Sequence, residues 1–163
     1  MTKVTITLPT ASPLHALEIW SNATAFAERF MAEMGFALPR LGTSGGTDAL
    51  RLIRFEPCVW LVEGDPTALT AILADDGAIT AIGGGIVRIR LSGGGWRSLL
   101  MEGGMFDAES PAFAAGGSAA TLIDHVAVRL HVISRDACDV YVPASFSQGL
   151  LHFWREALEH LTE

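Results

Sequence analysis

The sequence predicts an α+β fold built from two packed ferredoxin-like halves of the βαββαβ type. Residues 14–85 show the order strand, helix, two strands, helix, strand in their apolar patterns, and residues 86–161 repeat part of that order. No residue-level repeat, low-complexity tract or linker separates the halves. We therefore expect residues 1–163 to form a single domain with two intimately packed halves.

The first elements follow from two different periodicities. Apolar residues alternate around residues 4–8 and over Leu14–Trp20, which predicts one or two strands. Apolar residues at i, i+3, i+4 and i+7 predict a helix over Ala23–Met34, with Ser21 or Asn22 available as its N-cap. This helix has the clearest pattern in the chain.

The rest of the first half alternates between turns and short elements. Leu41–Asp48 is rich in glycine and is expected to be a loop. Strands are predicted over residues 50–55 and 59–62, because both runs are apolar and meet at a turn. A helix is expected from Pro66 to about Ala74, since proline suits the first turn of a helix. Gly77 is expected to end it.

The second half begins at a glycine turn. Ile79–Ile82 and Ile86–Leu91 are predicted strands on either side of Gly83–Gly85, and a short helix is expected over Trp96–Met101. Three further strands are expected at residues 119–123, 126–132 and 139–142. A last helix should open at Ser145, which forms a capping-box pattern with Gln148. Its apolar stripe consists of Leu151, Trp154, Leu158 and Leu161.

Composition and charge exclude some classes of partner. The net charge is −7, and Lys3 is the sole lysine, so the chain lacks the basic patch that nucleic-acid binding needs. Apolar residues make up 50% of the chain, 17 more residues are glycine, and 18% are charged, below the usual quarter. A large core or a broad apolar face covered by another chain would explain this composition.

Cysteine usage and the absence of long apolar runs indicate a compartment. Cys58 and Cys138 lie in apolar surroundings and are expected to be inert core thiols in a reducing environment. The N-terminus lacks the apolar run of a signal peptide, and no later segment reaches the ~18 apolar residues of a membrane span. We expect a cytoplasmic protein without a membrane partner.

Two glycine-containing segments resemble catalytic or binding motifs. The segment from Gly42 to Gly46 matches the G-x-S-x-G nucleophile elbow at Ser44, but a strand rather than a helix is predicted after it. The segment Ser92–Gly95 lies between a strand and a helix, where backbone amides cradle phosphates in some proteins. The dinucleotide fingerprint is incomplete there because Ser98 stands where glycine or alanine is needed. A flexible loop and a turn are the simpler interpretations.

Titratable residues form two further patterns without completing a site. His152, Glu156 and His160 recur on the final helix, but eight residues of helix separate the histidines by about 12 Å, too far for one metal ion. Asp124 and His125 resemble part of a catalytic dyad, yet they lie where two strands meet. The tryptophans are expected to be core or interface anchors: Trp20, Trp60, Trp96 and Trp154. We predict no catalytic, cofactor-binding or metal-binding residue.

The chain resembles the gamma subunit of heterotetrameric sarcosine oxidase from about Leu14 to Leu158. The matching residues are Ala49–Leu52, Glu56-Pro57, Trp60–Val62, Val87–Leu91, Gly93, Arg97–Leu100, Gly103, Asp107, Phe113, Thr121-Leu122, Asp139–Val142 and Ser145-Phe146. That family's fold is similar to part of the folate-binding aminomethyltransferase fold of the glycine cleavage T-protein. The chain departs from the family pattern at Glu56, Thr80–Gly83 and Ala144, which keeps a related demethylase or a diverged paralogue open.

The resemblance implies a non-catalytic accessory subunit that packs against a large flavoprotein alpha subunit. That complex oxidises sarcosine to glycine, and its flavins, NAD and tetrahydrofolate belong to the larger subunits rather than to gamma. From its charge-poor composition, the chain on its own is expected to form a homodimer or a concentration-dependent aggregate. Two alternatives remain: a stand-alone folate- or small-molecule-binding module of the aminomethyltransferase type, and a small hydrolase using Ser44.

Overall fold

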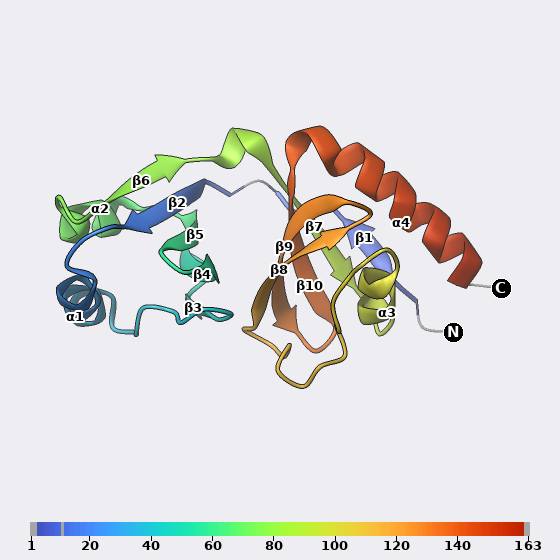
Figure 1. Ribbon diagram of the computed structural model, residues 1–163, viewed down its shortest axis with the longest axis horizontal. Helices are drawn as coiled ribbons and strands as arrows, with labels where there is room; N and C mark the ends of the chain where they lie inside the picture. Colours follow the sequence, from blue (N-terminus) through green and yellow to red (C-terminus); the bar gives the residue numbers. More distant parts are fainter. Residues whose placement is uncertain (1–2, 11, 162–163) are drawn as a thin grey trace. The chain divides into compact units, whose positions relative to one another are not determined.

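The computed structural model describes residues 3–10 and 12–161 and divides into two compact units (Figure 1). The middle unit comprises Ser12–Gly83, and the terminal unit combines Met1–Ala11 with Gly84–Glu163. Each unit has its own five-stranded antiparallel sheet and its own apolar core, which gives the predicted α+β class.

The middle unit is a ferredoxin-like βαββαβ unit with one added strand. Its elements are β2 (Leu14–Ile19), α1 (Ala23–Met34), β3 (Ser44–Gly46), β4 (Leu50–Glu56), β5 (Val59–Gly64), α2 (Thr67–Leu73) and β6 (Gly77–Ala81). The sheet order is β3-β4-β5-β2-β6. Without β3, the first strand lies between the third and the fourth, which is the ferredoxin-like arrangement. The helix predicted over Ala23–Met34 is confirmed.

Two expectations for the middle unit were wrong. Part of the glycine-rich segment 41–48 forms β3, which pairs with β4 through Ser44↔Ile53 and Gly46↔Arg51. A Cβ on Gly46 would lie 2.2 Å from the carbonyl oxygen of Leu50, so here glycine permits a tight hairpin instead of a loop. Gly77 does not end α2; the helix ends at Leu73, and Gly77 is the first residue of β6.

The terminal unit has the same strand order, completed by the N-terminal strand. Its elements are β1 (Thr5–Thr7), β7 (Ile86–Ser92), α3 (Trp96–Met101), β8 (Ser118–Ile123), β9 (Val126–Ser134), β10 (Ala137–Pro143), the 3₁₀ turn η2 (Ala144–Phe146) and α4 (Ser147–Leu161). The 3₁₀ turn η1 (Gly83–Gly85) contains the boundary between the two units. The sheet order is β1-β7-β10-β9-β8. Aligned with the middle unit, β7 corresponds to β2 and β1 occupies the place of β6. The repeat looks partial in sequence because its fourth strand comes from the other end of the chain.

The final helix begins later than its capping box predicts. Ser145 lies in the 3₁₀ turn η2, and the α-helix starts at Ser147, whose hydroxyl donates to the carbonyl oxygen of Ala144 at 2.8 Å. Leu151 and Trp154 are buried as expected, and Leu158 is partly buried. The side chain of Leu161 lies outside the described residues.

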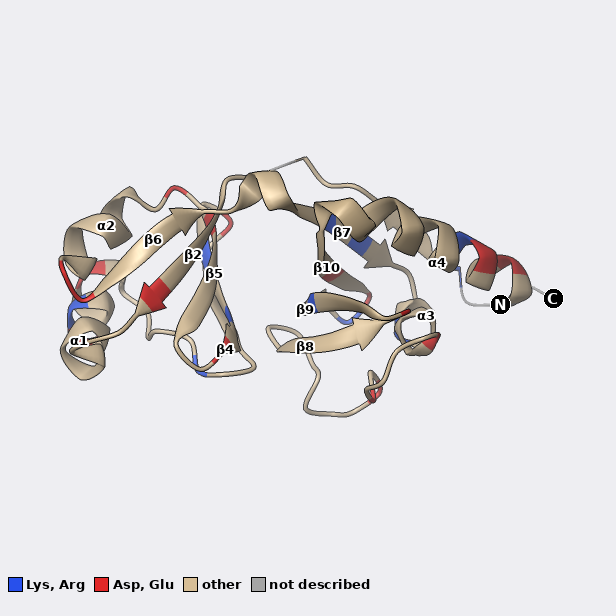
Figure 2. Ribbon diagram, turned by 45° about the horizontal axis from the view of Figure 1, so that its top comes forward, with Lys and Arg blue, Asp and Glu red and all other residues tan. Residues whose placement is uncertain are grey.

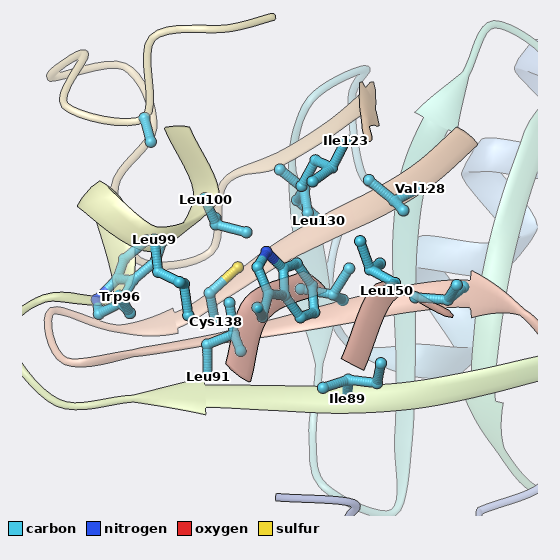
Figure 3. Packing of buried hydrophobic residues seen from close by; sticks show 14 of the residues in the cluster. Ile89, Leu91, Trp96, Leu99, Leu100, Ile123, Val128, Leu130, Cys138 and Leu150 are labelled. Atoms are coloured by element: carbon cyan, nitrogen blue, oxygen red, sulfur yellow. The ribbon is translucent and has the colours of Figure 1, made fainter. Parts of the chain in front are cut away.

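The helices of each unit cover one face of its sheet. In the middle unit, α1 and α2 pack on the sheet through Phe26, Phe30, Leu69 and Leu73. In the terminal unit, Ile89 and Leu91 of β7 lie near Leu99 of α3 and Leu150 of α4 (Figure 3). Alternate strand residues point to the opposite, helix-free faces. Among the described residues, no helix is both long and apolar enough to span a membrane.

Candidate functional site

Ser44 does not lie in a nucleophile elbow. It is the first residue of the edge strand β3, and a hairpin joins that strand to β4. An elbow needs a sharp turn from a strand into a helix, with the serine at its tip. The local structure therefore gives no support to the hydrolase alternative.

The glycine segment before α3 allows a close approach between two parts of the backbone. Gly93 has φ 103°, and its amide donates to the carbonyl oxygen of Asp136 at 2.9 Å. A Cβ on Gly93 would lie 2.0 Å from the carbonyl oxygen of Lys3, so glycine lets the N-terminal segment pass close to the sheet. Because α3 has only six residues, few peptide dipoles add up along it, and its N-terminus attracts an anion weakly.

Asp124 and His125 are the two central residues of the β8–β9 hairpin. Both have positive φ, 46° and 65°, as a two-residue turn of type I′ requires. The amide of Asp124 donates to the carbonyl oxygen of Gly103 at 3.0 Å. Both side chains are exposed, so the pair has a turn-forming role and lacks the enclosed surroundings of a general base.

The helical histidine pattern is a solvated face of α4. His152 Nε2 lies 3.4 Å from Glu156 Oε1, and both side chains are exposed. His160 is one turn beyond Glu156 and is exposed as well. Among the described residues, no group of three or more histidine, cysteine, aspartate or glutamate side chains is placed to hold a metal ion.

The four tryptophans differ in their surroundings. Trp60 and Trp96 are buried, and their indole N–H groups donate to the carbonyl oxygens of Pro39 and Arg135, each at 2.9 Å. Trp154 is fully buried in the core of the terminal unit. Trp20 is 64% exposed at the end of β2. Three therefore anchor cores, and one is presented to solvent.

The two cysteines are not alike, although both were expected in a core. Cys138 is buried; burial is the main cause of the raised pKa of its thiol, and the charge of Asp139 adds to it. Cys58 is exposed, because Pro57 and Cys58 form the turn between β4 and β5. The expectation of an inert core thiol is wrong for the location of Cys58.

A polar row on the helix-free face of the terminal sheet was not foreseen from the sequence. The backbone registers place Arg90, Asp139, His131 and Ser118 side by side on four neighbouring strands. Asp139 is 0% exposed, and Arg90 donates to both of its oxygens, from Nε at 2.7 Å and Nη2 at 2.8 Å. With both oxygens engaged by a guanidinium, Asp139 is suited to fixing the strand register rather than to accepting a substrate proton.

Asp76 organises a second polar cluster, at the end of the middle unit's sheet. Its Oδ1 accepts from Ser21 Oγ at 3.0 Å and from Asn22 Nδ2 at 2.7 Å, and its Oδ2 from Arg29 Nη2 at 2.6 Å. Its backbone carbonyl accepts the amides of Trp20 and Ser21. Asn22 is the N-cap residue of α1 but has φ 47° and makes no side-chain cap bond, because its amide binds Asp76 instead.

We expect Asp76→Asn to lower stability at neutral pH and to have a smaller effect in acid. The hydrogen bonds from Asn22 and Arg29 lower the pKa of Asp76 below its ordinary 3.8. The ionised carboxylate therefore stabilises the fold fully above pH 3.8, and this contribution is lost as pH falls through the lower folded-state pKa. Denaturant midpoints of both proteins between pH 7 and pH 2.5 measure this. Asp75→Asn is the control, and a pH-independent gap would contradict the prediction.

Comparisons with known proteins give a fold match without a sequence match. No protein-family model matches the chain, and no curated protein matches it. A chain of heterotetrameric sarcosine oxidase from Corynebacterium sp. U-96 is similar in structure, with a TM-score of 0.85 and 17% identity over 98% of this chain and 86% of that one.

The glycine cleavage system aminomethyltransferase T from Bartonella henselae is a second structural neighbour. Its TM-score is 0.65 with 17% identity over 93% of this chain, which spans 45% of the aminomethyltransferase chain. Both folds agree with the resemblance seen in the sequence. The chain thus shares the α+β fold found in a heterotetrameric sarcosine oxidase chain and in part of aminomethyltransferase T.

Proposed function

We propose that this chain is a non-catalytic accessory subunit of a cytoplasmic sarcosine oxidase-type flavoprotein complex. The observation that carries the proposal is the likeness to a heterotetrameric sarcosine oxidase chain, which extends over 98% of this chain and 86% of the other. Agreement across almost all of both chains is expected of subunits with the same place in an assembly. The oxidation of sarcosine, and the flavins, NAD and tetrahydrofolate it uses, would then belong to the larger subunits.

The structural roles of the candidate residues support an accessory role. Ser44 is paired in a strand, Asp124 and His125 form a hairpin turn, and Asp139 is held by Arg90. Catalysis by any of them would require a nucleophile and a base within hydrogen-bond reach of each other and of a substrate. The positions of these side chains serve the fold.

Co-expression with a large flavoprotein subunit of the sarcosine oxidase type, sought among the adjacent genes, tests the proposal. We expect size-exclusion chromatography to give one yellow complex that contains this chain and a large flavoprotein subunit and turns over sarcosine. The chain purified alone should be colourless and inactive, and should form a homodimer or aggregate because only 18% of its residues are charged and apolar surface is left uncovered. A yellow, monodisperse monomer that oxidises sarcosine unaided would refute the proposal.

A stand-alone folate-binding module is the second candidate, because aminomethyltransferase T has the same fold over 93% of this chain. The two candidates differ in what the isolated protein binds. Titration calorimetry of the purified chain with tetrahydrofolate separates them. Tight binding by a stable monomer would favour the folate module, and binding only within the flavoprotein complex would favour the accessory subunit.

A further inference from the structure

We infer that the turn carrying Trp20 is the anchor through which this chain docks on a basic surface of a partner protein. If the proposed function holds, that partner is the large flavoprotein subunit, and the inference in this form rests on it. The anchor is defined as Trp20 together with the exposed carboxylates of Glu18 and Asp75. It lies at the end of the middle unit's sheet where β2 leads into α1.

Trp20 is exposed on a turn that hydrogen bonds hold in place. The amides of Trp20 and Ser21 both donate to the carbonyl oxygen of Asp76, at 3.0 and 3.2 Å. The side chains of Ser21 and Asn22 donate to the carboxylate of the same residue. One position before the tryptophan, the amide of Ile19 donates to the carbonyl oxygen of Cys58 at 3.2 Å. The backbone on both sides of Trp20 is therefore tied to two other segments.

A fixed and exposed tryptophan has the physical properties of an interface hot spot. Tryptophan is enriched among the residues that carry most of the binding energy, because its large ring buries much apolar area with little loss of side-chain freedom. Exposing that ring in the free chain costs solvation energy, which a partner recovers on burying it. Because the turn is already ordered, binding loses little further backbone entropy.

The turn between β4 and β5 lies beside the end of β2. The hydrogen bond from Ile19 to Cys58 brings the β4–β5 turn against the end of β2, and Pro57 and Cys58 are both exposed there. The same turn also carries a charged group, because the guanidinium of Arg54 donates to the carbonyl oxygens of Glu56 and Pro57. A partner that covers this turn together with Trp20 would shield the indole ring from water, as the neighbours of a hot-spot residue do.

The charges around Trp20 indicate a basic partner surface. Glu18 lies two residues before it, and Asp75 adjoins the Asp76 cluster; both are exposed. Figure 2 shows acidic residues in red at the tip of β2 and on the turn before β6. Two nearby cations are already engaged: Arg29 pairs with Asp76 at 2.6 Å, and Arg54 donates to the carbonyl oxygens of the β4–β5 turn. A partner that brings arginine or lysine would meet the carboxylates and could stack on the indole ring.

The same charges disfavour a second copy of this chain as the occupant. The chain has a net charge of −7, and a symmetric contact would place Glu18 and Asp75 against identical carboxylates. Like charges in an interface reduce affinity, particularly at low salt. We therefore expect the anchor to bind a different protein that presents a basic surface.

The test measures, by surface plasmon resonance, how tightly this chain binds the purified flavoprotein subunit. Wild type, Trp20→Ala, Trp20→Phe and the exposed control Met105→Ala from the terminal unit are compared. We expect Trp20→Ala to weaken binding about 30-fold or more, Trp20→Phe to weaken it less, and Met105→Ala to leave it unchanged. Equal denaturation midpoints would show that each variant is folded.

Charge reversal gives an independent measurement of the same surface. We expect Glu18→Lys combined with Asp75→Lys to slow association roughly tenfold at low salt, with the effect fading at high salt. Two lysines introduced elsewhere at exposed acids, Glu102→Lys and Glu109→Lys in the terminal unit, are the matched control for net charge. The fluorescence of Trp20 is the part of the wild-type emission that Trp20→Phe lacks. In the complex, acrylamide should no longer quench this part.

The outcomes separate the inference from the proposed function. If wild type does not bind the flavoprotein subunit, the proposed function and this inference both fail. If wild type binds and Trp20→Ala binds equally well, only the inference fails. A homodimer of wild type that Trp20→Ala dissociates would assign the anchor to a second copy and overturn the basic partner. An equal loss in Met105→Ala would indicate nonspecific apolar association and would also overturn it.

Discussion

Replacing Trp154 by alanine is expected to destabilise the protein by about 3–5 kcal/mol, the usual cost of truncating a buried aromatic side chain. Trp154 is 0% exposed and belongs to the core cluster that contains Ile89, Leu91 and Leu130. Removing its indole leaves a cavity that these neighbours cannot fill without moving off their preferred rotamers. Guanidinium titration followed by circular dichroism measures the loss. Trp20→Ala, at the exposed tryptophan, should change stability by about 0.5 kcal/mol or less.

The indole nitrogen of Trp154 allows a sharper version of this test. Nε1 of Trp154 is buried and has no hydrogen-bond partner among the described residues, whereas Nε1 of Trp96 donates to the carbonyl oxygen of Arg135 at 2.9 Å. Trp154→Phe therefore loses packing area but no hydrogen bond, and Trp96→Phe loses both. We expect Trp96→Phe to cost more by about 1 kcal/mol. A loss below about 1 kcal/mol in Trp154→Ala would mean that α4 does not pack as described.

Local patterns predicted the elements whose causes are local. The apolar repeat over Ala23–Met34 predicted α1, since its buried residues Phe26 and Phe30 recur at helical spacing. Alternation of arginine with Val87, Ile89 and Leu91 predicted β7 with one apolar face. In these cases the residues that decide the structure lie within one element. Their periodicity in the sequence is therefore sufficient.

The features that the sequence did not predict are those decided by contacts between distant segments. β1 has only three residues, and its place beside β7 depends on a partner more than 80 residues away. The Asp76 cluster joins residues 54 and 55 positions apart, so no motif could show it. Trp20 continues the alternation of β2 and looked like part of the strand, yet Asp76 draws the chain into a turn there and leaves the ring exposed.

The Arg90–Asp139 pair had a partial signal in the sequence. Arg88 and Arg90 alternate with apolar residues, and Asp139 lies between Cys138 and Val140, both fully buried. A carboxylate in a buried strand needs a partner, and arginine on a polar strand face is the usual one. What could not be read is the register that brings the two together, because the sequence does not show which strands are neighbours.

Arg90→Met is expected to destabilise the protein by about 3 kcal/mol, because it leaves the carboxylate of Asp139 without its guanidinium. Asp139 is 0% exposed, so water cannot replace both hydrogen bonds, while the 35% exposed side chain of Arg90 places the loss at the lower end of the range for buried pairs. The double variant Arg90→Met, Asp139→Leu should recover most of the loss, since two apolar groups need no partner. Urea titrations of wild type, both single variants and the double variant complete the cycle, with Arg155→Met on the exposed face of α4 as control. If the double variant is no more stable than Arg90→Met, the loss comes from packing of the arginine stem and the ion pair does not hold the strands in register.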